Sequence, residues 1–160
     1  MKNLFGIGIF ALFWRAIPLY ILAVFLITAN SYADSYADTQ ESAMVAIAFP
    51  STSESVISRS SLRAIFGMRL NRWPADTPVK VFVMKDDAPE HDAFSKNLLK
   101  VFPHQLRLAW DRQVFSGQGQ YPEQVNSTQE MLSKIASTPG AIGYIKTNEV
   151  TDNVRILQLR

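Results

Sequence analysis

Residues 85–92 gather the side chains of this chain that are best able to do chemistry, in the order KDDAPEHD. His91 with Asp87 and Asp92 would offer a metal ion one imidazole and two carboxylates. The acidic residues also have a structural explanation, because carboxylates gather where a helix begins and its unpaired N–H groups favour negative charge. We take the structural explanation as the simpler one, so no metal site is predicted.

A second group of reactive side chains is basic. Four arginines fall within fourteen residues beside three serines: Arg59, Arg63, Arg69 and Arg72, with Ser58, Ser60 and Ser61. Together these side chains can form a site for an anion. The simpler interpretation of the same spacing is a solvated helix face followed by a loop.

No set of residues predicts an enzyme. Gly117 and Gly119 lack the lysine and the strand-to-helix context of a phosphate-binding loop. The chain has two histidines, and no serine, histidine and aspartate follow the order of a known catalytic triad. We therefore predict no catalytic residue and no cofactor, and we expect His104 at the surface or at a helix end.

The elements that must position these residues alternate between strand and helix. Strands are predicted at residues 43–49, 79–84, 141–145 and 154–159, and helices from Ser58 or Ser60 to Gly67, from an Asp87 cap through residue 102, over residues 104–115, and from Ser127 to Pro139. Short apolar or alternating runs indicate the strands, while serine or aspartate caps and apolar stripes indicate the helices. This alternation predicts an α/β domain with one small mixed β-sheet flanked by helices.

The first 33 residues are unlike the rest of the chain. An apolar run at residues 4–29 follows Lys2 and contains Arg15, and residues 31–33 and 35–37 each offer a small residue, a spacer and alanine. A secretory signal peptide cleaved at Ala33 or Ala37 has this pattern, and so does an uncleaved membrane anchor. Either interpretation delivers the domain at residues 43–160 to the outside, after a polar leader at residues 34–42.

The charge of the exported part excludes one class of partner. The chain has 16 basic and 14 acidic residues, and removing residues 1–33, which contain Lys2 and Arg15 and no acidic residue, leaves 14 of each. A nucleic-acid-binding domain would normally carry a basic excess, so no nucleic acid is predicted. The absence of cysteine excludes a disulfide framework and fits an oxidising compartment.

Several motifs follow one another in order between residues 43 and 146. They read SSLRAIF at 60–66, RLNRWP at 69–74, a strand and loop at 83–94, Trp110 with FSG at 115–117 and Pro122, and TPGAIGY at 138–144. Together they resemble the periplasmic phosphate-binding proteins of ABC transporters, in particular short, stand-alone members. The resemblance implies one lobe of a periplasmic solute-binding protein, and it implies phosphate or another oxyanion as the ligand.

The ligand loop departs from the pattern of that family, which reads roughly R-x-D-x-S-G-T before a helix. Lys85 stands at the arginine and Asp87 at the aspartate, while residues 89–91 (PEH) stand at Ser-Gly-Thr. Proline has no N–H to donate, and Glu90 brings a carboxylate to the place of the anion. The matched region corresponds to about one lobe, so one chain offers half of a cleft.

Two functions from different classes are therefore predicted. In the first, an exported, phosphate-type substrate-binding protein holds an oxyanion with five residues, two lobes meeting in a homodimer: Lys85, Asp87, Ser58, Ser60 and Arg63. In the second, a non-transporting periplasmic interaction module has lost the ligand site and docks a membrane or periplasmic protein. On both accounts the buried core is predicted to include Trp73, Phe94, Trp110 and Tyr144.

Overall fold

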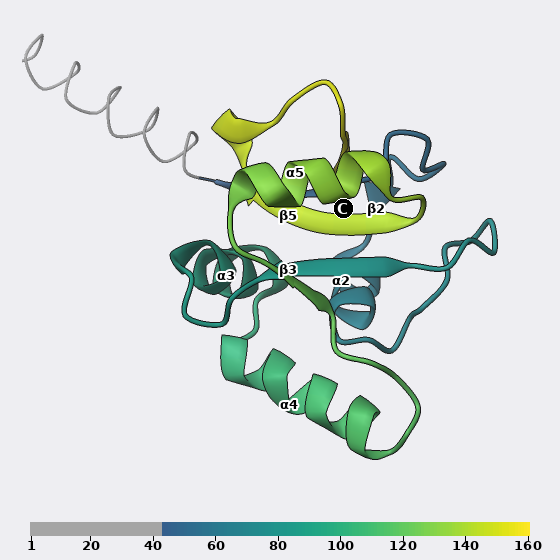
Figure 1. Cartoon of the computed structure of the whole chain (residues 1–160), viewed down its shortest axis with the longest axis vertical. Coiled ribbons are helices and arrows are strands. Elements are labelled where there is room, and N and C mark those ends of the chain that lie inside the picture. Colours follow the sequence, from purple (N-terminus) through teal and green to yellow (C-terminus); the bar gives the residue numbers. More distant parts are fainter. Residues whose placement is uncertain (1–42) are drawn as a thin grey trace, which may run out of the picture. The chain divides into compact units, whose positions relative to one another are not determined.

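Six strands form one sheet in the part of the chain that the structure, a computed structural model, describes: residues 43–160 (Figure 1). They are β1 (Met44–Ala48), β2 (Val56–Ile57), β3 (Lys80–Met84), β4 (Glu123–Val125), β5 (Ala141–Lys146) and β6 (Arg155–Leu159), in the order β2-β6-β1-β5-β3-β4. β1 is antiparallel to both of its neighbours, and every other neighbouring pair is parallel. The predicted α/β class with a single mixed sheet is confirmed.

The helices are α2 (Arg59–Phe66), α3 (Pro89–Ala93), the π-helix η1 (Phe94–Leu99), α4 (Pro103–Phe115), α5 (Thr128–Ser137) and the 3₁₀ turn η2 (Thr147–Glu149). The predicted cap of α2 is confirmed, because the Ser58 side chain accepts a hydrogen bond from the Ser61 N–H at 3.0 Å. The predicted Asp87 cap is wrong. Ala88 precedes α3 instead, without a side-chain cap, and the helix changes to π geometry at Phe94.

Consecutive residues of β5 show how helices cover the two faces of the sheet. A side chain at Gly143 would collide with Met131 and Ile135 of α5, so α5 packs directly on the backbone of β5. Tyr144 points to the opposite face, where its ring stacks on Phe94 of η1 with centroids 3.8 Å apart. Successive side chains of a strand point to opposite faces of the sheet. At β5, α5 therefore covers one face, and η1 and α2 cover the other.

Aromatic rings form the centre of the core between the sheet and α2, η1 and α4. Phe66 of α2 packs against both Phe94 and Tyr144, and Trp110 of α4 donates its indole N–H to the Phe66 carbonyl oxygen at 2.6 Å. Trp73, on the loop before β3, donates to the Gly140 carbonyl oxygen at 3.0 Å. All four aromatic residues predicted for the core are buried.

Two strands were not predicted, because β2 has two residues and β4 has three, too few to show an alternating pattern.

Within residues 43–160 no helix combines the length and the apolar character needed to cross a membrane. The predicted signal or anchor and its leader lie outside the described residues and stay predictions.

Trp110→Ala should lower the free energy of unfolding by about 3–5 kcal/mol, because it empties a fully enclosed site and leaves the Phe66 carbonyl without its donor. Leu108→Ala on the same helix should cost less than about 1 kcal/mol, since Leu108 is half exposed. Urea unfolding of both variants checks this. Equal losses in the two variants would contradict the packing described here.

Candidate functional site

Three parallel strands end at the same edge of the sheet, and each is followed by the start of a helix. β3 leads to α3, β4 leads to α5, and β5 leads to η2. A hollow of about 310 Å³ lies at this edge. It is lined by Lys85, Asp87 and Glu90 from the β3–α3 side and by Asn126, Ser127 and Thr128 from the β4–α5 side. Ligands of open α/β sheets bind at such carboxyl edges, so this is the candidate site.

The carboxylate of Glu90 lies on the β3–α3 side of this hollow and already forms an ion pair. Its Oε1 lies 3.0 Å from the Lys146 Nζ at the end of β5. That hydrogen bond, with a further one from the backbone N–H of Glu90 itself, lowers the pKa of Glu90, and the pair raises the pKa of Lys146. Each partner therefore favours the charged form of the other.

The start of α3 has no N–H group left for an anion. Pro89 has none, and the N–H of Glu90 bonds to its own carboxylate. The N–H groups of His91 and Asp92 both donate to the Ala88 carbonyl oxygen, at 3.0 and 3.1 Å. A helix start binds phosphate through unpaired N–H groups, and here they are all used.

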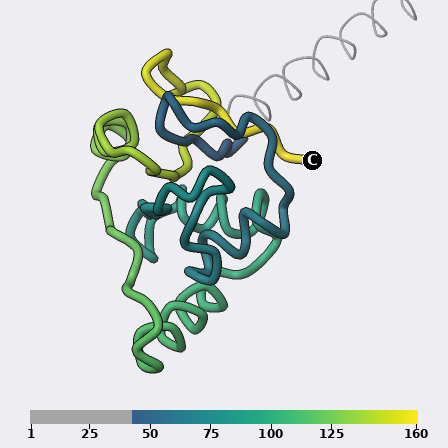
Figure 2. The backbone as a smooth tube through the Cα atoms, turned by 90° about the vertical axis from the view of Figure 1, so that its right-hand side faces the viewer, coloured from purple at the N-terminus to yellow at the C-terminus, as the bar shows by residue number. Residues whose placement is uncertain are grey.

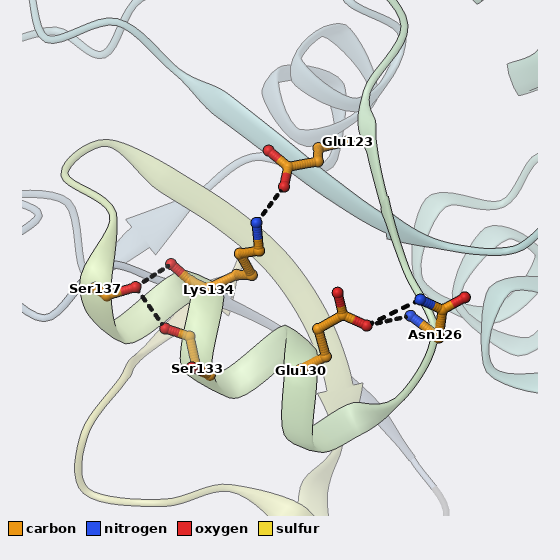
Figure 3. A network of polar contacts seen from close by, with 6 residues as sticks. All are labelled: Glu123, Asn126, Glu130, Ser133, Lys134 and Ser137. Atoms are coloured by element: carbon orange, nitrogen blue, oxygen red, sulfur yellow. Dashed lines mark hydrogen bonds and ion pairs between the residues drawn. The ribbon is translucent and has the colours of Figure 1, made fainter.

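Side chains cap the start of α5, where the Glu130 carboxylate points at Asn126 (Figure 3). The Ser127 side chain accepts a hydrogen bond from the Glu130 N–H at 3.1 Å, as the predicted capping box requires. The Glu130 carboxylate turns back to the N–H and side-chain amide of Asn126, at 2.8 and 3.1 Å, rather than to Ser127. The N–H groups of Thr128 and Gln129 have no acceptor among the described residues.

Lys85 is exposed at the rim of the hollow and forms no ion pair within residues 43–160. Its neighbour Asp86 pairs instead with Arg107 of α4. The hollow thus carries two ammonium groups, Lys85 and Lys146, against two carboxylates, Asp87 and Glu90. This balance gives an incoming anion little net attraction.

His91 points away from the hollow and into the core. Met84 donates its N–H to the Tyr144 hydroxyl at 2.8 Å, and the same hydroxyl lies 2.7 Å from His91 Nδ1 in a second hydrogen bond. Burial lowers the pKa of His91 and so favours its neutral form, and its Nε2 has no hydrogen-bond partner among the described residues. No three histidine, cysteine, aspartate or glutamate side chains in the described part of the chain lie close enough together to hold a metal.

The predicted arginine and serine residues lie elsewhere. Of the five predicted ligand residues, Lys85 and Asp87 line the hollow, whereas Ser58, Ser60 and Arg63 do not. Ser60 bonds to the capping Ser58 hydroxyl at 2.8 Å. The Arg63 Nε donates to the Leu99 carbonyl oxygen at 2.5 Å, and the Arg59 Nε donates to that of Leu98 at 3.2 Å, so these arginines cover the end of η1.

Sequence reasoning missed Lys146 and the residues that follow β4. Lys146 is 56 positions from Glu90, and no local motif joins them. The rule that parallel strands end at one edge would have pointed to Asn126, Ser127 and Thr128. It could not be applied because β4 was not recognised as a strand.

Comparison with solved structures identifies the fold of this domain. A phosphate ABC transporter substrate-binding protein of Clostridium perfringens, solved with bound phosphate, aligns with a TM-score of 0.60 at 16% identity, over 73% of this chain and 44% of that one. An ABC-type phosphate transport receptor of Vibrio cholerae aligns with 0.58 at 15% identity, over 73% and 46%. PstS of Borrelia burgdorferi aligns with 0.58 at 21% identity, over 74% and 47%.

These alignments confirm the predicted likeness to one lobe of a phosphate-type solute-binding protein. The chain spans less than half the length of the solved proteins that it matches. No protein-family model matches the sequence, and comparison with curated proteins finds no match.

The buried neutral His91 should make stability depend on pH. Burial lowers its pKa in the fold, against an opposing effect of Asp86, while the unfolded chain takes up a proton near pH 6.5. The unfolded state therefore binds more protons in acid, so stability is complete above that pH and is lost as the pH falls through it. Between about pH 7.5 and about pH 5.5 the free energy of unfolding should fall by about 1 kcal/mol from this group.

Urea unfolding of the original chain and of the His91→Gln variant across this pH range measures the contribution of His91 to stability. The variant should lose most of the pH dependence. His104→Gln is the matched control, because His104 is exposed, and it should keep the dependence of the original chain. An unchanged pH slope in His91→Gln would show that His91 is not buried neutral.

Proposed function

We propose that this chain is an exported solute-binding-type lobe that works as an interaction module, in which a side chain of the protein itself occupies the oxyanion position. The observation that supports this is the Glu90 carboxylate, which lies at the start of α3 on its own N–H and 3.0 Å from Lys146. Phosphate would need the same N–H group and would meet a permanent negative charge there.

The extent of the fold supports the same proposal. The alignments span 44–47% of the solved phosphate-transport proteins, which is about one lobe. A small anion gives up strong hydration when it binds, and it needs donors on all sides to replace that hydration. A hollow open on one side, with balanced charge, supplies few of them.

In a second candidate function, the domain still binds an oxyanion. Lys85 has no ion pair in the described part of the chain, and the N–H groups of Thr128 and Gln129 have no acceptor there. Lys85 and Thr128 line the same hollow and Gln129 follows Thr128, so these donors could hold phosphate from the α5 side, with a second copy of the chain closing the cleft. Under this candidate the chain is a phosphate-type substrate-binding protein, and it catalyses no reaction.

Calorimetric titration of the exported domain with phosphate distinguishes the two candidates. We expect no detectable binding at up to about 10 mM phosphate. Glu90→Ser removes the carboxylate and releases both an N–H group and the Lys146 ammonium, so it should strengthen phosphate binding at least about tenfold. Adding Lys85→Ala to that variant should weaken the binding again.

Asp92→Asn is the matched control, because Asp92 lies on the same helix but pairs with Lys96 at 2.8 Å, away from the hollow. It removes the same charge and should leave phosphate binding undetectable. Micromolar binding by the unaltered domain would refute the interaction module and establish the second candidate.

A further inference from the structure

The outer side of α4 carries apolar side chains that nothing in the described part of the chain covers. In both views α4 lies at the end of the domain opposite α5, with its outer side free (Figures 1 and 2). Phe115 is 85% exposed and Leu108 is 51% exposed, while Phe102 just before the helix is 55% exposed. Soluble domains seldom expose several large apolar residues along one helix without a partner for them.

Arginines lie beside these apolar residues. Arg112 follows Leu108 by four positions, and Phe115 follows Arg112 by three. This spacing places the three residues along one side of a helix. Arg112 also lines a hollow of about 210 Å³ between α2 and α4, together with Arg63 and Arg69. The rest of the lining is apolar, amide or glycine, and no acidic residue contributes to it.

The positive charge of this hollow is not neutralised within residues 43–160. None of its three arginines forms an ion pair there. The acidic residues closest along α4 and its flank are already engaged. Asp86 pairs with Arg107, and Asp111 accepts a hydrogen bond from the Tyr121 hydroxyl at 2.8 Å and keeps its charge, so three arginines face one carboxylate here. The face formed by Phe102, Leu108, Arg112, Phe115 and the hollow, here called the α4 face, therefore attracts anions.

We propose that the α4 face docks the domain onto an anionic lipid bilayer. Its exposed apolar side chains can insert at the boundary between headgroups and acyl chains. The neighbouring arginines can bind lipid phosphates at the same depth. A protein partner of comparable affinity would need a broad complementary surface, whereas a fluid bilayer accommodates separate side chains.

The predicted leader supports this occupant. Thirteen residues, 30–42, separate the apolar run at residues 4–29 from the domain, and an extended chain of that length reaches about 45 Å. If residues 4–29 are retained as an anchor, the domain stays within that distance of the membrane, where a weak docking surface is already effective. The proposal does not depend on the hollow near Glu90 or on its occupant.

Co-flotation of the domain at residues 42–160, which contains the whole core described above, tests the proposal on vesicles. We expect binding to phosphatidylcholine vesicles that contain roughly 30% phosphatidylglycerol and little binding to pure phosphatidylcholine vesicles. Leu108→Ser with Phe115→Ser should reduce the bound fraction at least about tenfold, and so should Arg69→Gln with Arg112→Gln. A thermal melt of each sample confirms that the variants remain folded.

Ile156→Ser with Lys80→Gln is the matched control, because it makes the same kinds of change at exposed positions of β6 and β3. Its binding should equal that of the original domain. Three results would overturn the proposal: no binding to anionic vesicles, equal losses in the control, or competition by about 10 mM phosphate at constant ionic strength, which would indicate a free-anion site. A dimer in sedimentation that the serine variants abolish, without vesicle binding, would assign the α4 face to a second copy.

Discussion

The hydroxyl of Tyr144 is the contact on which the arrangement of this domain depends. β3 and β5 pair only at Lys80 and Val81, so by Met84 the two strands have separated and the Met84 N–H has no backbone acceptor on β5. The Tyr144 hydroxyl accepts the hydrogen bond from the Met84 N–H and forms a second hydrogen bond with His91 Nδ1. A buried N–H without an acceptor costs free energy comparable to a lost hydrogen bond, so one side chain holds the end of β3, the middle of β5 and the start of α3 together.

This contact also determines what the neighbouring hollow can bind. By drawing the imidazole of His91 into the core, it removes the third residue of the altered ligand loop from the surface. It also sets the rotation of α3, so that Glu90, one position earlier, faces the carboxyl edge of the sheet. Lys146 lies two residues after Tyr144 on β5, and it therefore projects to the same side as Tyr144 and meets Glu90. The ion pair that closes the oxyanion position follows from the packing of the core.

The sequence predicted those parts of the fold that depend on local patterns. β1, β3, β5 and β6 show as apolar or alternating runs, Ser58 and Ser127 mark helix starts, and the four aromatic residues predicted for the core are all buried. The prediction failed where nonlocal contacts decide. Asp87 has the spacing of a cap, but Ala88 precedes the helix, and the chain turns into π geometry where Phe94 and Ser95 enter the core. The candidate site was predicted least well. The ion pair of Glu90 and Lys146 joins residues from two elements, and the local sequence of neither element indicates it.

The two candidate surfaces of this domain differ in their balance of charge. At the carboxyl edge of the sheet Glu90 is already paired with Lys146, so a ligand that takes the place of the Glu90 carboxylate must break an existing interaction before it gains a new one. At the α4 face the nearby acidic groups are already held by Arg107 and Tyr121, while Arg63, Arg69 and Arg112 remain around a hollow without a carboxylate. An anionic partner there displaces only water. Under the two proposals, the carboxyl edge of the sheet is filled by side chains of the domain itself, while the α4 face at the other end of the domain is open to an anionic partner.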